Sequence, residues 1–389
     1  MHLLTPTYRK LQQSAQQFVA RHIIPVAAEY DRKAEFHEFI LEEAAKAGYL
    51  SMAIPKEYGG AGYDSVSQAI VLEAWGYGCA GFGTTLAATC LSVDSLLVAG
   101  TDEQKKLFFD PLVKGGIAAF ALTEPGAGSD AGAGTSTAIK AGSEYVLNGT
   151  KCFISNGGYA KVYVLYAVTD PSKGLKGISA FIVERSRPGV VIGAVEHKLG
   201  IRSSNTVELL LNDVKVPESN LLGKEGDGMK IAMKTLDMAR PPAGALAVGV
   251  AQRALDECIK FYRTKYGSGK IQPGQAAQFR LADMEIQIQA ARQLVLHAFA
   301  LRDSGLPFSK ESAIAKTFCS DVAMCVTTDA LNLLGSYGYS GDCVVEKLVR
   351  DAKILQIYEG TNQIQRLVIA RQLLAEPDPA KSQAQKAGK

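Results

Sequence analysis

The sequence predicts a multidomain α+β protein, with an N-terminal helical domain over residues 1–115, a middle antiparallel β domain over 116–224 and a C-terminal four-helix bundle over 225–375. The main observation is a change of period. Hydrophobic residues follow helical spacing to about residue 115, change to short β-rich runs, and return to long helical stripes after about residue 222. The length of 389 residues is also enough for two or three domains with a substantial core.

The N-terminal domain is expected to contain helices over residues 5–21, 37–47 and 65–76. Each shows apolar residues at intervals of three or four, which is the spacing of one helix face. A further helix is expected to start at Thr101, because Gln104 three residues later completes a capping box.

Short β-rich runs broken by glycine, asparagine, aspartate and proline fill the middle domain. The clearest run is 144-EYVLNGTKCFIS-155, in which two alternating segments flank Asn148-Gly149, and this pattern predicts a β-hairpin. The runs VYVLYAV, ISAFIVE and TVELLL predict further strands of an antiparallel sheet or barrel.

Four long helical patterns follow, over residues 227–265, 279–298, 309–335 and 344–358, and helices of this length imply a bundle. In the second pattern, apolar residues recur every three or four positions and are expected to face the core. This stripe consists of Phe279, Ala282, Ile286, Ala290, Leu294 and Ala298. The polar tail, residues 376–389, is expected to be disordered.

Composition excludes several classes of protein. A net charge of +3 is close to neutral for this length, so no electrostatic footprint for nucleic acid is expected. The seven cysteines show no C-x-x-C spacing, which predicts free thiols in a reducing cytoplasm. The N-terminus turns polar too early for a signal peptide, and no apolar run is expected to span a membrane. The five histidines are scattered, so no metal site is expected.

One carboxylate stands apart in the stretch 353-KILQIYEGTNQIQRLVIA-370. Glu359 lies where the hydrophobic spacing breaks, and Gly360 is expected to end the helix that precedes it. Asn362 and Gln365 fit a capping box that starts the next helix. The residues alone leave two interpretations of Glu359 open: a carboxylate that acts on a ligand, and a solvated loop residue.

A glycine-rich loop, 119-AFALTEPGAGSDAGAG-134, is the second candidate for chemistry. Its glycine spacing does not match G-x-G-x-x-G and a strand-like segment follows, which argues against a Rossmann phosphate turn. Successive glycines would instead let backbone N–H groups approach a phosphate or a polar heterocycle, with hydroxyls from Thr123 and Ser129. A flexible connection is the alternative. No G-x-S-x-G elbow is present, which argues against a serine hydrolase.

Six stretches resemble those of the acyl-CoA dehydrogenases, in the order of that family and from about residue 5 to residue 375. They are ALTEPGAGSDAG, KCFISNGG, KLGIRSSNT, DVKVPESNLLG, LDMARPPAGALAVGVAQRAL and RDAKILQIYEGTNQIQR. The resemblance implies the family's three-domain fold, non-covalent FAD, a homotetramer and desaturation of an acyl-CoA thioester. It also implies that electrons pass to an electron-transfer flavoprotein.

The resemblance implies roles for individual residues. Glu359 matches the family's catalytic base, which removes a proton from Cα of the substrate. The positions that match substrate-binding residues are Ser129, Asp237, Arg240 and Gly360. The positions that match FAD-binding residues are Phe120, Ala121, Leu122, Thr123, Gly128, Ser129, Phe153, Ile154, Ser155, Arg263, Gln275, Asn332, Ser336, Thr361, Asn362 and Gln363.

Three departures from the family pattern concern the FAD site. Phe153 stands where a tryptophan is common. The family's R-x-x-F-G motif, which reaches the FAD of a neighbouring subunit, occurs as RTKYG from Arg263, one residue early relative to Gln275. Asn332 and Ser336 stand where relatives usually carry glutamine and glycine.

Related functions remain open on the sequence. An acyl-CoA oxidase or an enzyme for carrier-protein-linked acyl groups would share these motifs, although such oxidases are usually longer. A non-catalytic, nucleic-acid-binding relative would need a basic stripe and usually lacks the base, whereas this chain keeps Glu359 and has no such stripe. The stretch 82-FGTTLAATCLS-92 matches the lining of the family's acyl pocket and carries no charge, which predicts a short or medium neutral acyl group.

Overall fold

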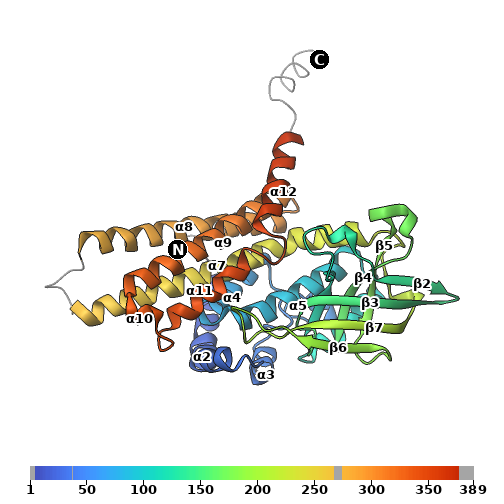
Figure 1. Ribbon diagram of the computed structural model, residues 1–389, viewed down its shortest axis with the longest axis horizontal. Helices are drawn as coiled ribbons and strands as arrows, with labels where there is room; N and C mark the ends of the chain where they lie inside the picture. Colours follow the sequence, from blue (N-terminus) through green and yellow to red (C-terminus); the bar gives the residue numbers. More distant parts are fainter. Residues whose placement is uncertain (1–4, 37, 267–273, 376–389) are drawn as a thin grey trace, which may run out of the picture.

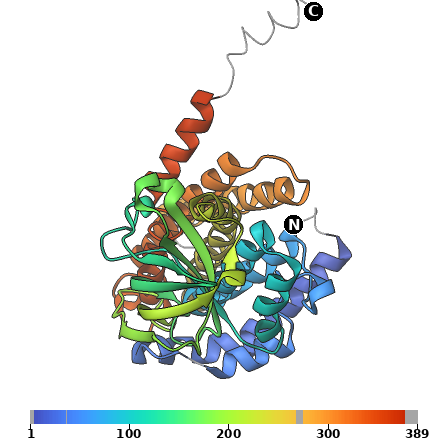
Figure 2. The ribbon, with the colours of Figure 1, turned by 90° about the vertical axis from the view of Figure 1, so that its right-hand side faces the viewer.

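The structure is a computed structural model that describes residues 5–36, 38–266 and 274–375 (Figure 1). It confirms the predicted fold class, with an N-terminal helical part, a β middle part and a C-terminal helical part in that order. Figure 2, viewed from the end that carries the sheet, shows the helices behind and around the strands. The tail over 376–389, expected to be disordered, lies outside the described residues.

The N-terminal domain contains a helix that is buried on nearly all sides, α5, which contacts α4 and α6 within the domain. Their bounds are α1 (Pro6–Phe18), α2 (Ile24–Lys33), α3 (Glu38–Lys46), α4 (Ser65–Gly78), α5 (Ala80–Ala99) and α6 (Asp102–Val113). The capping box predicted for α6 is confirmed. Thr101 Oγ1 accepts the Gln104 N–H at 3.3 Å, and Gln104 Oε1 accepts the Thr101 N–H at 3.0 Å.

The sequence does not predict α5, because a helix that is buried on nearly all sides shows no polar face and therefore no periodicity. By length and composition alone, α5 is also apolar enough to cross a membrane. Most of the helix is buried against α4, the long helix α7 (Gly228–Tyr266) and β1 (Ala118–Ala121). In this structure α5 is therefore a long apolar helix of the protein core.

Among the described residues, the middle domain forms one sheet of eight strands. Their bounds are β1 (Ala118–Ala121), β2 (Thr137–Ala141), β3 (Glu144–Ser155), β4 (Val162–Val168), β5 (Ile178–Glu184), β6 (Val190–Val195), β7 (Thr206–Pro217) and β8 (Leu221–Leu222). The order is β6-β7-β3-β2-β4-β5-β8, and β1 pairs with β4 off this path. The pairs are antiparallel except β1–β4 and β2–β4, which are parallel.

The hairpin predicted around Asn148 and Gly149 is wrong. Glu144–Ser155 is a single strand, and its register against β7 shifts at Gly149, which marks a β-bulge. The turn between β2 and β3 lies instead at Gly142, whose φ of 65° is in the left-handed region that favours glycine. Gly149 is needed for a different reason, because a Cβ there would lie 2.3 Å from Ser136 Oγ.

The C-terminal bundle is built on α7, a helix of 39 residues. The other helices are α8 (Gln275–Asp303), α9 (Ser309–Leu334), α10 (Ser336–Tyr339), α11 (Val344–Leu355) and α12 (Asn362–Ala375). Figure 1 shows α7, α8 and α9 side by side along the long axis, with the sheet at one end.

The apolar stripe predicted to face the core from α8 is largely wrong. Phe279 and Ile286 are 61% and 65% exposed, whereas Met284, Ile288 and Val295 are buried. α8 carries apolar residues on two faces, and the face that packs on α7 and α9 is rotated from the one that the spacing indicated. Much of the predicted stripe therefore lies on the surface of the single chain.

A close crossing of α4 and α7 joins the N-terminal domain to the bundle. A Cβ on Gly249 would lie 2.1 Å from the Glu73 carbonyl oxygen, and a Cβ on Gly76 would lie 2.3 Å from the Leu246 carbonyl oxygen. Side-chain carbons do not approach backbone so closely, so the glycines allow the two helix backbones to touch. Because α5 follows α4 directly, the crossing also fixes α5 beside α7.

We expect Gly249→Ala to lower the free energy of unfolding by ~1–3 kcal/mol, because the added methyl group must push α4 away from α7. Urea unfolding followed by circular dichroism measures the change. The control is Gly341→Ala, since a Cβ on Gly341 would meet no atom within 4 Å. Equal loss of stability in both variants would contradict this account of the crossing.

Candidate active site

The candidate site is built around the turn between α11 and α12, where Glu359 has φ 55° and Gly360 has φ 88°. A non-glycine residue in the left-handed region is strained and persists only where other contacts hold it. The expectation that Gly360 ends the preceding helix is wrong, because α11 ends at Leu355. The residue with the strained backbone conformation is therefore Glu359 itself, the residue that carries the carboxylate.

Contacts from α12 hold the turn in this conformation. Gln365 Nε2 donates to the carbonyl oxygens of Glu359, at 3.2 Å, and Gly360, at 3.0 Å. This use of the Gln365 amide makes the predicted Asn362–Gln365 capping box wrong. Thr361 caps α12 instead, since its Oγ1 accepts the Ile364 N–H at 3.3 Å.

Contacts from α9 complete the hold on the turn. Lys316 Nζ donates to Gly360 O and to Asn362 Oδ1, both at 2.8 Å. The Asn362 amide in turn donates to Ser320 Oγ at 2.9 Å and Asp321 Oδ1 at 2.8 Å. The backbone of the turn is thus tied to two helices, and none of these contacts uses the Glu359 side chain.

Glu359 is half-buried, and its carboxylate oxygen Oε2 is shielded from solvent and has no hydrogen-bond partner among the described residues. Burial raises its pKa to about 8, although the positive charges of Lys316 and Arg240 act in the opposite direction. With one carboxylate oxygen shielded from solvent, Glu359 is not a fully solvated loop carboxylate. Buried polar atoms without a partner are rare in proteins, and a ligand is one explanation for such an atom.

Two predicted substrate-binding residues, Asp237 and Arg240, lie on α7 and form an ion pair. Arg240 is only 4% exposed and donates to the Asp237 carboxylate, while its Nε has no partner among the described residues. Pro241 has no N–H to offer the carbonyl oxygen of Asp237 one turn earlier, and Ser312 Oγ donates to that oxygen at 2.6 Å. The structure brings Arg240 close enough to Glu359 for each to act on the other's pKa, and Asp237 is the hydrogen-bond partner of Arg240.

Three further charged residues around Glu359 are not predicted from the sequence: Lys316, Asp94 and Arg302. Arg302 Nη2 donates to Asp94 Oδ1 at 2.8 Å, and Asp94 is almost completely buried. Asp94 raises the pKa of Glu359, whereas Lys316 lowers it. One signal in the sequence could have pointed to them, namely a charged residue inside an otherwise apolar helical pattern. Ionisable residues are seldom fully buried unless they are paired, so such a residue is a candidate for a buried site.

The glycine-rich loop after β1 is closed by a buried ion pair. Lys151 Nζ donates to Glu124 Oε1 at 2.6 Å and to Leu122 O at 3.3 Å. Glu124 also accepts the N–H groups of Thr135, at 2.6 Å, and Ser136, at 3.1 Å. Burial alone would raise the pKa of Glu124, but Lys151 and these hydrogen bonds lower it to about 2. The loop is thus an anchored element and not a flexible connection.

The glycine-rich loop and strand β3 lie beside each other and together form a solvent-exposed surface, here called the open face. The Cys152 N–H donates to Thr123 O at 3.0 Å, which ties the loop to the strand just before Phe153. Phe153 is 64% exposed with φ 55°, and Ser129 is exposed on the loop. A Cβ on Gly128 would meet nothing within 4 Å, so the space above this backbone is open. Other predicted residues of this face are partly buried or buried: Phe120, Ala121, Leu122, Thr123, Ile154 and Ser155.

Four predicted cofactor residues lie elsewhere. Arg263, Gln275, Asn332 and Ser336 are all exposed at the ends of α7, α8, α9 and α10 that lie away from the sheet (Figure 1). Arg263 is 23 residues beyond Arg240 on the same helix, about 35 Å along the axis at 1.5 Å per residue. One chain does not bring these four residues to the glycine-rich loop. In the segment after Glu359, Gln363 is exposed, whereas Asn362 is buried and donates a hydrogen bond to Ser320.

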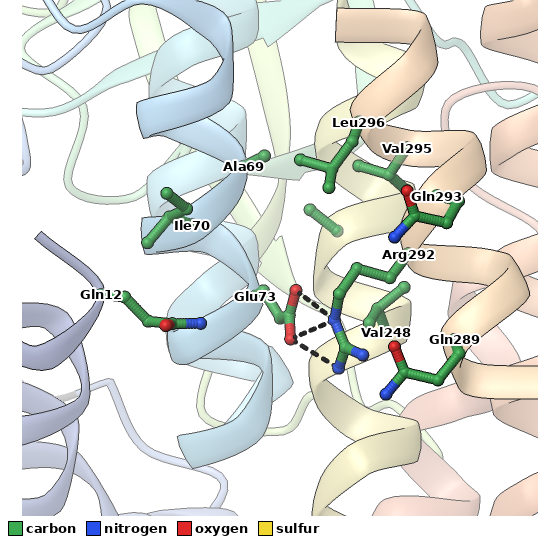
Figure 3. Close-up of a pocket in the computed structure, with 11 residues that line it drawn as sticks. Gln12, Ala69, Ile70, Glu73, Val248, Gln289, Arg292, Gln293, Val295 and Leu296 are labelled. Carbon is green, nitrogen blue, oxygen red and sulfur yellow. Dashed lines mark hydrogen bonds and ion pairs between the residues drawn. The ribbon is translucent and has the colours of Figure 1, made fainter. Parts of the chain in front are cut away.

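A separate pocket of about 130 Å³ lies between α1, α4, α7 and α8 (Figure 3). Its charged groups satisfy each other, because Arg292 Nη2 donates to Glu73 Oε1 at 2.9 Å and to Gln252 Oε1 at 3.0 Å. None of the residues predicted for the site lines this pocket. Among the residues that the structure describes, no group of three or more His, Cys, Asp or Glu side chains could hold a metal ion.

Comparisons with known proteins cover nearly the whole chain. Family models described as the N-terminal, middle and C-terminal domains of acyl-CoA dehydrogenase match residues 5–116, 119–214 and 226–374. The acryloyl-CoA reductase (NADH) of Anaerotignum propionicum is 46% identical over 95% of this chain and 95% of its own length.

Two solved structures are similar to the chain along its length. Butyryl-CoA dehydrogenase from Megasphaera elsdenii has a TM-score of 0.92 at 42% identity, covering 95% of this chain and 99% of that one. A chain in a structure described as the electron transferring flavoprotein of Acidaminococcus fermentans has a TM-score of 0.93 at 43% identity, covering 96% of this chain and 99% of that one.

We expect Glu359→Gln to stabilise the protein at high pH. The folded-state pKa of Glu359, about 8, lies above its ordinary value of 4.5, so the cost of the buried charge is absent at low pH and grows as pH rises from 4.5 to 8. Glutamine cannot ionise, and the variant should gain ~1–3 kcal/mol over the wild type between pH 5 and pH 9, the usual cost of a buried polar group without a partner.

Urea unfolding at a series of pH values measures this difference. Glu57→Gln, at an exposed position, is the control and should show no such trend. A stability difference between Glu359→Gln and the wild type that stays constant from pH 5 to pH 9 would mean that Glu359 does not titrate as a buried acid.

Proposed function

The chain belongs to the acyl-CoA dehydrogenase family, and we propose that it desaturates an acyl-CoA thioester between Cα and Cβ, with Glu359 as the base and FAD as the hydride acceptor. The observation that carries the proposal is the Oε2 atom of Glu359, which is shielded from solvent and has no partner among the described residues, on a turn that other residues hold. When ionised, a carboxylate that no group of the protein binds can accept a proton from a ligand, and the α-proton of a thioester is such a proton.

The residues of the open face fit FAD. A backbone hydrogen bond ties the glycine-rich loop to strand β3. The loop offers the exposed backbone around Gly128 and the hydroxyls of Thr123 and Ser129, and the strand offers the exposed ring of Phe153. Backbone N–H groups suit phosphates, and an aromatic ring suits the flavin ring system. When bound, FAD would accept the hydride from Cβ, which no side chain can do.

The chain's own residues would prepare the proton transfer in three ways. Burial of Glu359 excludes water and raises its pKa towards neutrality, where a base works most efficiently. Lys316 and Arg240 limit this rise, so the acid can still ionise. The Glu359 N–H donates to no group in the described part of the chain. It is therefore free to polarise the thioester carbonyl as negative charge develops.

We place the chain in a homotetramer assembled through the C-terminal bundle. Arg263, Gln275, Asn332 and Ser336 would reach the FAD of a neighbouring subunit, which would explain their separation from the loop in one chain. The exposed apolar face of α8, with Phe279 and Ile286, would be covered in such an assembly. A cytoplasmic location is proposed from the cysteines, which are free in the structure.

Electron-transfer flavoprotein is the proposed electron acceptor, supported by the likeness to a chain in the Acidaminococcus structure. Reduction of an enoyl-CoA is a second candidate, because the relative from Anaerotignum propionicum is named for acryloyl-CoA reduction and proton and hydride transfers are reversible. An acyl-CoA oxidase and a carrier-protein-linked dehydrogenase are the remaining alternatives. Substrate-dependent consumption of oxygen would distinguish the oxidase.

The central prediction of the proposal concerns the rate of flavin reduction. Glu359→Gln keeps the shape of the side chain and should leave FAD and acyl-CoA binding nearly intact, but it should slow flavin reduction at least ~10²–10⁴-fold. Anaerobic stopped-flow mixing with butyryl-CoA, following the oxidised flavin band, measures the rate. Glu57→Gln controls for removal of an exposed carboxylate. Bleaching of the Glu359→Gln flavin within a few-fold of the wild-type rate would remove Glu359 from the mechanism.

We expect a preference for short or medium neutral acyl groups. Residues 82–92 on α5 carry no charge and are buried, and Asp94, the one charged residue of α5, is neutralised by Arg302. An apolar slot discriminates by only about 1–3 kcal/mol per methylene, so activities towards butyryl-, hexanoyl- and octanoyl-CoA should overlap. A steady-state panel of acyl-CoA thioesters tests this. A clear preference for glutaryl-CoA would contradict it.

A further inference from the structure

We propose that Lys316 is a positioning residue that holds the Glu359 turn in place and supplies the positive charge against which the base works. The inference rests on the proposed function of Glu359 as base. It assigns an electrostatic role, beyond its hydrogen bonds to the turn, to a lysine that forms no hydrogen bond with the Glu359 carboxylate.

The geometry around Lys316 is unusual for a buried cation. The residue is 0% exposed on α9, and its Nζ donates to Gly360 O and Asn362 Oδ1, both at 2.8 Å. Both partners are neutral, and no ion pair joins Lys316 to a carboxylate within the described residues. Buried charges are usually paired, so a buried ammonium bound only to neutral oxygens leaves its charge available to a nearby acid.

Every other cation near Glu359 already has an acid of its own. Arg240 donates to Asp237, and Arg302 donates to Asp94. Two further titratable groups interact with Glu359, Cys90 on α5 and Tyr358 beside the acid, and Asp321 on α9 acts on Lys316. None of them is a cation. Lys316 is therefore the one group in this described cluster whose positive charge is not compensated by a bonded carboxylate.

The electrostatics agree with this geometry. Burial lowers the pKa of Lys316 to about 8, and the charge of Glu359 opposes the change. Burial raises the pKa of Glu359 to about 8, and Lys316 is the first of the groups that oppose that change. Two interacting groups with similar proton affinity titrate as a pair. The fraction of Glu359 that is ionised near neutral pH thus depends on the positive charge of Lys316.

A purely structural role for Lys316 makes a different forecast. If the lysine only supplied N–H donors to Gly360 and Asn362, a neutral donor would replace it without changing how Glu359 titrates. Two variants separate the roles. Lys316→Gln removes the charge but keeps an N–H donor, whereas Lys316→Met removes both and leaves the two oxygens without a partner.

The test is a pH titration of the Glu359 carboxyl band by infrared spectroscopy, assigned by subtracting the spectrum of Glu359→Gln. We expect Lys316→Gln to raise the titration midpoint by ~1–3 pH units, the usual effect of an opposite charge at close range. Flavin reduction at pH 7 should fall ~10-fold or more and recover at higher pH. Lys353→Gln, at an exposed position of α11, should leave both unchanged.

Reciprocity gives a second measurement that does not need a Lys316 variant to fold. Because Glu359 raises the pKa of Lys316, Glu359→Gln should lower the pH at which the Lys316 ammonium titrates, followed by NMR of 15N-lysine protein. An unchanged carboxyl midpoint in Lys316→Gln, or an unchanged lysine titration in Glu359→Gln, would overturn the proposal. A wild-type flavin that no acyl-CoA reduces would instead sink the proposed function and leave both titrations interpretable.

Discussion

The constraint on which the rest of this structure depends is that Glu359 must be buried, unpaired and still able to ionise. A carboxylate in such a place destabilises the fold, and its backbone is strained at φ 55°. The surrounding contacts offset this by fixing everything except the carboxylate. Gln365 and Lys316 bind the carbonyl oxygens of the turn, and Asn362 links the turn to α9. The acid is left with nothing to bind inside the protein.

The rest of the fold keeps the helix that carries this turn in place. Charged side chains join α11 to the N-terminal and middle domains. Lys347 donates to Asp351 and to Cys79 Sγ, at 3.2 Å for the latter, and Asp351 accepts the Ile201 N–H from the middle domain. Arg350 reaches α2 and donates to Asp31 at 2.7 Å. Breaking one partner of a buried pair usually costs several kcal/mol, so these contacts strongly specify where α11 lies.

The sequence predicts the order of the elements better than their local details. The change of period near residue 116 is visible because helices and strands space their apolar residues differently. Periodicity fails where a helix has no polar face, as in α5, or two apolar faces, as in α8. Asn148-Gly149 has the composition of a turn, but Gly149 is required by the close approach of Ser136, which only the tertiary structure reveals.

The same limits apply to the candidate site. Glu359 could be found because a lone acid at a break in an apolar pattern is a local signal, and family resemblance added Asp237 and Arg240. Lys316, Asp94 and Arg302 come from α9, α5 and α8, and nothing local relates them to the turn. Their role appears only when the helices are packed together.

The account's central claim is that the free Oε2 of Glu359 faces the α-carbon of a bound acyl-CoA. A crystal structure of the FAD-loaded protein with an acyl-CoA analogue that cannot be desaturated tests this directly. The account predicts Oε2 at ~3–3.5 Å from the α-carbon, the separation of a reactive pair, with Lys316 still bound to Gly360 O. A structure in which the α-carbon lies beyond the reach of Oε2, and Glu359 instead forms an internal ion pair with Lys316, would contradict it.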